Sequence, residues 1–249
     1  LFHIRRFQTT TAVFPKRFWQ FVPETIQKND HDYYKLEPHD VAATPQRFFD
    51  AANLKYLVTE ATSSFSSQNF SLVYDNDLKI YENKSVLPRA YVVFRAETAR
   101  NMEDARAKFY NASFDWKRSV IVEDEESLGL QGSLRPYQPV KIISYEPDEV
   151  ILRTNLDQEG ILVLTDTYYS EWRASIDGVA VRVYPANVLF RAVKVSAGEH
   201  EIRFVMRPWW FWPSVFVSLF TIITMVFLFL KKSTIGKVHL TIRAWLTKQ

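Results

Sequence analysis

The chain has 249 residues, of which 47% are hydrophobic and 15% aromatic, so it is long enough for one large or two small folded units. Its formal net charge of +3 is unevenly distributed, because the segment after residue 230 holds five basic residues and no acidic one, leaving about −2 on the portion before it. This balance excludes an electrostatic footprint for nucleic-acid binding. The lack of cysteine excludes disulfides, thiol catalysis and thiolate metal sites, although it does not fix the compartment.

Residues 1–125 predict an α+β unit in which helices and strands are interleaved. Apolar residues recur at helical spacing over positions 14–26, with a break at Pro23. Thr44-Pro45 is typical of a helix start, and Asn101 is placed to cap a further helix. Strands are predicted at 54–59, 70–74, 78–81, 91–94 and 120–122, and Asp75-Asn76-Asp77 indicates a hairpin turn.

Two groups of acidic residues in this unit have simple structural interpretations. Asp75, Asp77 and Glu82 lack the glycine and the remaining ligands of an EF-hand loop, which favours turn chemistry over calcium binding. The four carboxylates of Glu123 to Glu126 would diverge on an extended segment, so we expect a solvated acidic stretch rather than an acid/base pair. It leads into a linker over residues 126–137.

Residues 138–207 predict a compact antiparallel β-sandwich. Asp177-Gly178 and Ala197-Gly198 are both two-residue hairpin signals between alternating strands. The predicted strands are Val140–Tyr145, Val150–Thr154, Ile161–Thr165, Trp172–Ile176, Val181–Tyr184, Leu189–Val195 and Glu201–Met206.

Residues 208–230 contain no charged side chain and predict a transmembrane helix. At about 1.5 Å per residue the segment spans roughly 34 Å, enough to cross a hydrocarbon core of about 30 Å. A buried core helix is the alternative, but such helices are usually shorter and keep a polar face. Interfacial anchors are expected at Trp209, Trp210 and Trp212 on one side and at Lys231 and Lys232 on the other. The sandwich would then lie against the bilayer surface.

Residues 231–249 form a short basic tail. Ile235, Val238, Ile242, Trp245 and Leu246 recur at spacings of three and four, with basic residues between them. That pattern is typical of an amphipathic helix on an anionic leaflet, and a frayed tail is an equally weighted alternative.

No catalytic residue, metal site or cofactor is predicted. The five histidines are scattered without metal-ligand spacing, and Asp30-His31-Asp32 is best explained as a polar loop. Glycine patterns for nucleotide binding and the nucleophile elbow are also absent from the sequence.

The aromatic segment at 168–173 is the candidate ligand-binding surface. Tyr168, Tyr169 and Trp172 could stack on sugar faces, and Arg173 could bind a phosphate. The alternative, which we favour, is that Tyr168 and Trp172 cover the open end of the sandwich core or touch lipid headgroups.

Several of these segments, taken in order, resemble the C-terminal region of the YfhO family of bacterial membrane proteins. They are residues 53–59, 80–83 with 87–90, 114–115 leading to 120–123, 162–173, 176–178, 184–187, 189–192, 197–200 and 204–208. The resemblance covers most of residues 15–230. Ser170-Glu171 departs from it, because the family usually has Pro-Gly before the tryptophan, which puts the turn geometry of this loop in doubt.

The resemblance implies a large polytopic protein similar to the GT-C glycosyltransferases, which use polyprenyl-phosphate-linked sugars at the outer membrane face. Relatives are associated with glycosylation of lipoteichoic acid or other envelope polymers. The acidic catalytic residue of that class lies in an early loop, so no catalytic residue is carried over to this chain.

The chain begins with Leu and shows no signal segment, so the N-terminal portion is either cytoplasmic or the end of a longer polytopic protein. The resemblance favours the second option, with residues 1–207 extracytoplasmic, 231–249 cytoplasmic, and further transmembrane helices of the same protein as partners. The rival hypothesis is a self-contained membrane-anchored glycan-binding or structural module without enzymatic activity.

Overall fold

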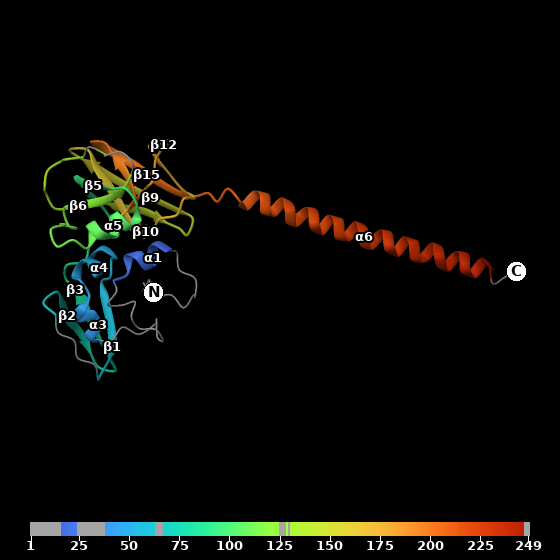
Figure 1. Cartoon of the computed structure of the whole chain (residues 1–249), viewed down its shortest axis with the longest axis horizontal. Coiled ribbons are helices and arrows are strands. Elements are labelled where there is room, and N and C mark those ends of the chain that lie inside the picture. The colour runs from blue at the N-terminus through green and yellow to red at the C-terminus, as the bar shows by residue number, and fades with distance from the viewer. Residues whose placement is uncertain (1–15, 24–37, 63–66, 125–127, 129, 247–249) are drawn as a thin grey trace. The chain divides into compact units, whose positions relative to one another are not determined.

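The protein was analysed as a computed structural model that describes residues 16–23, 38–62, 67–124, 128 and 130–246. The chain divides into two compact units, Leu1–Met206 and Arg207–Gln249. The first unit is built mostly from antiparallel sheets, and the second is one long helix (Figure 1). This agrees with the predicted class, in which an α+β unit and an antiparallel β-sandwich are followed by one C-terminal apolar helix.

Helix α4 is tied to the rest of its unit through a buried carboxylate. Asp50 is fully buried and accepts hydrogen bonds from Gln46 (2.8 Å), Asn83 (3.0 Å) and Ser85 (2.7 Å). A buried carboxyl group costs free energy unless it is hydrogen-bonded, so these three bonds stabilise the burial of Asp50. The described helices before the first strand are α1 (Lys16–Phe21), α3 (Pro38–Ala43) and α4 (Gln46–Ala51).

A three-stranded antiparallel sheet lies at one end of the first unit (Figure 1). Its order is β1–β3–β2, and the predicted hairpin around Asp75-Asn76-Asp77 is confirmed by the pairing of β2 with β3. Only one face carries buried side chains, such as Tyr81, whereas Tyr56 and Val58 on β1 are exposed. The strands are β1 (Tyr56–Glu60), β2 (Phe70–Asp75) and β3 (Leu78–Asn83).

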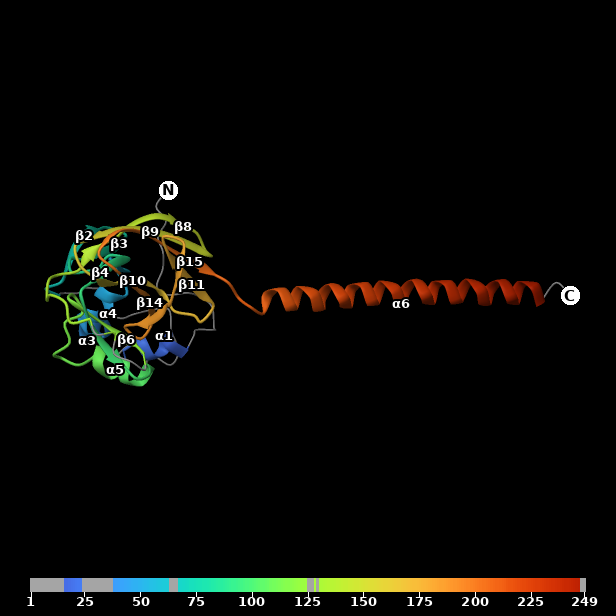
Figure 2. The same cartoon turned by 90° about the horizontal axis from the view of Figure 1, so that it is seen from above.

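A seven-stranded sheet of order β5–β6–β13–β14–β10–β4–β7 forms the centre of the unit (Figure 2). Its β5 and β6 are parallel and are joined by α5 (Met102–Phe109). The predicted cap is confirmed, because the Asn101 side chain accepts a 2.9 Å hydrogen bond from the Asp104 N–H. The strands are β4 (Ala90–Val93), β5 (Arg95–Ala99), β6 (Ser119–Glu123), β7 (Gln138–Pro139), β10 (Gly160–Thr167), β13 (Tyr184–Ala186) and β14 (Phe190–Val195).

A five-stranded sheet of order β12–β11–β15–β9–β8 completes the sandwich. Leu152, Ile202 and Phe204 from this sheet share a buried cluster with Leu162 and Val193 of the seven-stranded sheet. Its strands are β8 (Lys141–Tyr145), β9 (Glu149–Leu156), β11 (Trp172–Ile176), β12 (Val179–Val181) and β15 (Gly198–Met206).

The other face of the seven-stranded sheet packs on the helices. Ile161 and Val163 of β10 belong to a cluster with Phe21 of α1, Phe48 of α4 and Phe109 of α5. Because both faces are covered, β10 reads as a continuous apolar run rather than as an alternating one.

Two features of the fold differ from local expectations. Strands β4, β5 and β6 precede the predicted 126–137 linker, yet they share one sheet with strands that follow it, so this segment does not separate two sheets. Ala197-Gly198 does not form a hairpin, because β14 and β15 belong to different sheets, and the turn carries the chain from one sheet to the other.

The prediction that Glu123 to Glu126 form a solvated acidic stretch is wrong for its first two residues, Glu123 and Asp124. The Arg17 guanidinium binds both carboxylate oxygens of Glu123, at 2.5 and 2.8 Å, and Asp124 pairs with Arg182 at 3.1 Å. Both carboxylates are largely buried, at 10% and 8% exposed. Glu125 and Glu126 lie outside the described residues.

The second unit contains α6 (Phe211–Leu246), a continuous helix of 36 residues. Its length is about 54 Å. The stretch Phe211–Phe229 has a mean hydropathy of 2.0 and none of it is buried, so it is long and apolar enough to cross a bilayer. The tail beyond Leu230 continues the same helix as far as Leu246.

Candidate functional site

The segment at 168–173 presents only part of its predicted binding surface. Trp172 begins β11 and is 6% exposed, so its ring is unavailable for stacking on a ligand. Tyr168 is half-buried, with the Arg17 guanidinium 5.1 Å from its ring centroid. Tyr169 is 41% exposed, and Arg173 is exposed with its guanidinium donating to the Ser170 carbonyl. The loop therefore offers Tyr169 and Arg173 to solvent.

Trp172 is covered by a buried cation. The Arg191 guanidinium carbon lies 3.6 Å from the Trp172 ring centroid, and Arg191 is only 2% exposed. Arg191 donates to Asp166 at 2.8 Å, and Arg89 donates to the other Asp166 oxygen at 2.6 Å. The Tyr145 hydroxyl completes the group by donating to Asp166 at 2.8 Å.

This group, which we call the Arg191 cluster (Arg89, Tyr145, Asp166, Trp172 and Arg191), places two cations against one carboxylate. Burial lowers the pKa of Arg191 to about 10, and the Asp166 charge opposes that shift. The Trp172 ring also helps to stabilise the buried charge of Arg191, because a cation is attracted to the negative face of an aromatic ring. The cluster holds the base of the 168–173 loop in place.

A bulge makes this arrangement possible. On β10, Leu164 pairs with Arg191 of β14 and Thr167 pairs with Phe190, the next residue of β14. Thr165 and Asp166 are therefore the extra residues of the bulge. Bulges re-aim side chains at strand ends. Here the bulged residue supplies the carboxylate.

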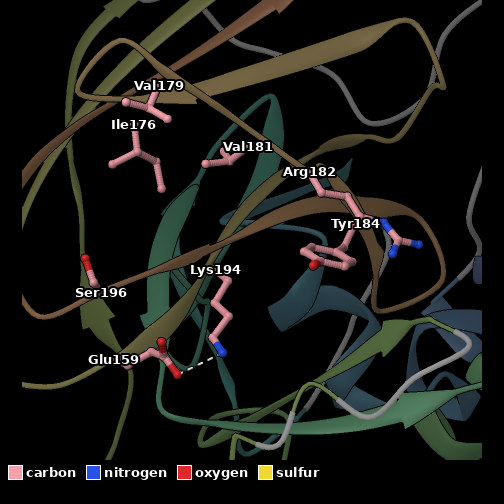
Figure 3. Close-up of a pocket in the computed structure, with 8 residues that line it drawn as sticks. All are labelled: Glu159, Ile176, Val179, Val181, Arg182, Tyr184, Lys194 and Ser196. Carbon is pink, nitrogen blue, oxygen red and sulfur yellow. Dashed lines mark ion pairs between the residues drawn. The ribbon is translucent and has the colours of Figure 1, made fainter.

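A shallow cavity of about 560 Å³ lies elsewhere on the sandwich (Figure 3). Ile176, Val179 and Val181 form its apolar wall. The opposite part is charged, with Lys194 bound to Glu159 at 2.9 Å. The remaining lining residues are Arg182, Tyr184 and Ser196.

The predicted interfacial residues border the apolar stretch of α6. Trp209 and Trp210 precede the helix and are 75% and 51% exposed, and Trp212 lies in its first turn at 65%. Lys231 and Lys232 lie within the helix, after the apolar stretch. Over the described residues, no group of three or more His, Cys, Asp or Glu side chains could hold a metal ion.

Comparison with protein families gives a match over the C-terminal part of the first unit and the start of the second. Residues 130–218 match the model described as bacterial membrane protein YfhO. Over these residues, which are about a third of the chain, the protein is similar to the YfhO family. In the structure, the YfhO match extends from Leu130 through β15 and into the first turns of α6. Together with the apolar helix it supports a membrane localisation. Searches of curated proteins and of solved structures return no match.

One group of side chains was not predicted from the sequence. His200 lies within hydrogen-bonding distance of both Asp177 and Ser196, although the sequence pattern predicted only a turn at Asp177 and an isolated histidine at position 200. The sequence signal that could have indicated this group is a pair of glycine turns. Asp177-Gly178 directly follows β11, and Ala197-Gly198 stands at the start of β15.

Proposed function

We propose that this chain is the extracytoplasmic C-terminal portion and last membrane helix of a YfhO-like membrane glycosyltransferase. The parent protein would transfer sugar from a polyprenyl-phosphate donor to lipoteichoic acid or a similar cell-envelope polymer. The present portion would be non-catalytic and would position the acceptor glycan. The observation that carries the proposal is the family match, because it extends from Leu130 through the later strands of the sandwich into the start of the apolar helix.

The sidedness follows from the proposal and can be tested directly. Because the chain has no cysteine, single cysteines can be introduced without removing native ones. Val179 is 69% exposed on the sandwich, and Lys248 lies in the basic tail. We expect Val179→Cys to react with a membrane-impermeant maleimide in intact cells, and Lys248→Cys to react only after permeabilisation. The reverse labelling pattern would place the sandwich in the cytoplasm and contradict the proposal.

Contact with the acceptor glycan would involve Tyr169 and Arg173, with Tyr168 and Trp172 supporting the loop. An exposed tyrosine ring can stack on the apolar face of a sugar, and a guanidinium can bind a phosphate in two-point fashion. We expect Tyr169→Ala in the detergent-solubilised chain to weaken binding of purified lipoteichoic acid by about threefold to tenfold.

Tyr74→Ala is the matched control, because Tyr74 is also 41% exposed but lies on the three-stranded sheet. Equal binding by the two variants and the unmodified chain would remove the sugar-platform role. The rival hypothesis, a self-contained anchored module, predicts a start codon and signal peptide directly upstream of Leu1. The transferase hypothesis predicts further hydrophobic segments in frame.

A further inference from the structure

Three side chains from separate strands meet at the start of β15. Asp177 follows β11, Ser196 follows β14, and His200 lies on β15. Nδ1 of His200 lies 2.6 Å from Oδ2 of Asp177, and its Nε2 lies 3.0 Å from Oγ of Ser196. These are the distances and the order of a nucleophile, a base and the carboxylate that orients the base.

The carboxylate of Asp177 is held by the backbone. Its Oδ1 accepts a 2.9 Å hydrogen bond from the N–H of Glu201, and the N–H of Asp177 donates to the Glu201 carbonyl at 2.9 Å. Oδ2 is thereby aimed at the imidazole. An ionised carboxylate can only accept, so Nδ1 of His200 carries the proton on that side. In the neutral ring, Nε2 then accepts from the Ser196 hydroxyl at 3.0 Å. When the ring is protonated, Nε2–H can donate to the Ala197 carbonyl, which lies 3.3 Å away.

The pKa of His200 is shifted in the direction that suits a general base. The hydrogen bond to Asp177 raises the pKa of His200, and the same bond lowers the pKa of Asp177. The imidazole therefore holds a proton more strongly than a free histidine does. Its side chain is 16% exposed, so the ring is partly shielded while the serine beside it is exposed.

Ser196 also lines the cavity described above. Figure 3 shows it at the same end as Glu159, away from Arg182 and Tyr184. The aliphatic wall of Ile176, Val179 and Val181 suits a small acyl chain. The charged and aromatic part of the cavity suits a polar alcohol.

We propose that Ser196, His200 and Asp177 form an acyl-transfer site that cleaves carboxylic esters of polar alcohols. This activity is separate from glycosyl transfer and does not depend on it.

The chemistry balances with water alone. Ser196 Oγ bonds to the ester carbonyl carbon while Nε2 of His200 takes the hydroxyl proton. The carbon–oxygen bond to the alcohol breaks, and the alcohol leaves with that proton. Water then gives a proton to His200, its oxygen bonds to the acyl carbon, and the carboxylic acid leaves as Ser196 regains its proton.

The test uses the full chain in detergent micelles and a fluorophosphonate probe, which captures serines activated in this way. We expect covalent labelling of the tryptic peptide that contains Ser196, and none in Ser196→Ala. His200→Gln should slow the labelling by about 100-fold or more, because a positioned general base contributes about that much. Ser113→Ala, which removes another exposed serine hydroxyl, should label at the unmodified rate.

Hydrolysis of p-nitrophenyl acetate gives a second readout and should fall with the labelling in the same variants. Circular dichroism and the melting temperature separate loss of activation from loss of fold, and Ser196→Ala removes only an exposed hydroxyl. A folded chain that takes no label at Ser196 overturns the proposal. Labelling that is equally fast in a folded His200→Gln variant also overturns it.

Discussion

The guanidinium carbon of Arg191 lies 3.6 Å from the ring centroid of Trp172, in the interior of the sandwich. The two residues lie on different sheets, since Arg191 belongs to β14 and Trp172 to β11. The contact therefore bridges the layers of the sandwich. It also explains why a tryptophan beside an exposed loop is unavailable to ligands.

Removing this cation should weaken the fold. Arg191→Met keeps much of the apolar stem but leaves Asp166 with Arg89 and Tyr145 only. Breaking a buried ion pair by removing one partner is strongly destabilising, and we expect a loss of about 3 kcal/mol in the free energy of unfolding. Urea denaturation of the solubilised chain, followed by tryptophan fluorescence, measures it.

Arg153→Met provides the comparison, because Arg153 pairs with Glu201 at 3.2 Å where both side chains are about half exposed. That variant should lose no more than about 1 kcal/mol. Similar losses in the two variants would mean that the Arg191 cluster contributes no more than a surface pair.

Replacing Gly132 or Gly178 with alanine should lower the free energy of unfolding by different amounts. A Cβ on Gly132 would lie 2.2 Å from the carbonyl oxygen of Phe94, so the backbone must move, and we expect Gly132→Ala to cost about 1–3 kcal/mol. Gly178 faces open space but has φ +83°, so Gly178→Ala should cost only about 1 kcal/mol of backbone strain. Thermal unfolding of both variants measures which one loses more stability. A larger loss in Gly178→Ala than in Gly132→Ala would contradict the prediction.

The pair formed by His200 and Asp177 should make stability depend on pH in a defined direction. The raised pKa of His200 means that its contribution is complete below about pH 6.5 and is lost as pH rises through the folded value. The lowered pKa of Asp177 means that its contribution is present above about pH 3.9 and is lost as pH falls through the folded value.

We therefore expect the melting temperature of His200→Gln to lie furthest below that of the unmodified chain between about pH 4 and 6.5. The difference should shrink at pH 9. A difference that stays constant from pH 5.5 to pH 9 would show that the charge on the imidazole does not contribute.

A charge in the middle of α6 should oppose membrane insertion. Phe220 lies near the centre of the apolar stretch and is 72% exposed. Phe220→Lys should raise the apparent insertion free energy by about 3–4 kcal/mol, from the added charge and the lost ring. Carbonate extraction of membranes should release part of this variant. Ser214→Lys, near the helix start, should stay in the pellet, and equal release of both would contradict a membrane-centred Phe220.

Local sequence predicted most strands after Gln138 because their apolar residues alternate and turn residues separate them. It missed β5, whose sequence Arg-Ala-Glu-Thr-Ala has little apolar character. That strand forms because it pairs in parallel with β6 and buries Ala96 and Ala99. The turn at Ala197-Gly198 was misread for a related reason, since the same local geometry can close a hairpin or lead into another sheet.

The candidate sites were less accessible to sequence reasoning. Sequence reasoning left two roles open for Trp172, stacking on a sugar or covering the sandwich core, because its covering partner, Arg191, is 19 positions later in the chain. Asp177 is likewise brought to His200 by the pairing of β11 with β15, whereas Ser196 is only four positions before His200 in the chain. Neither arrangement has a local motif, because each depends on long-range register.

The mixed origin of the seven-stranded sheet has a consequence for dissecting the protein. The YfhO match begins at residue 130, but β10 pairs with β4 and β13 pairs with β6, and both of those partners come earlier in the chain. A fragment cut to the limits of the match would expose two unpaired backbone edges and the apolar side of β10. Such edges recruit other chains, so the truncated piece should aggregate rather than fold. The region that the family model matches is thus smaller than the piece of chain that must be expressed together to fold.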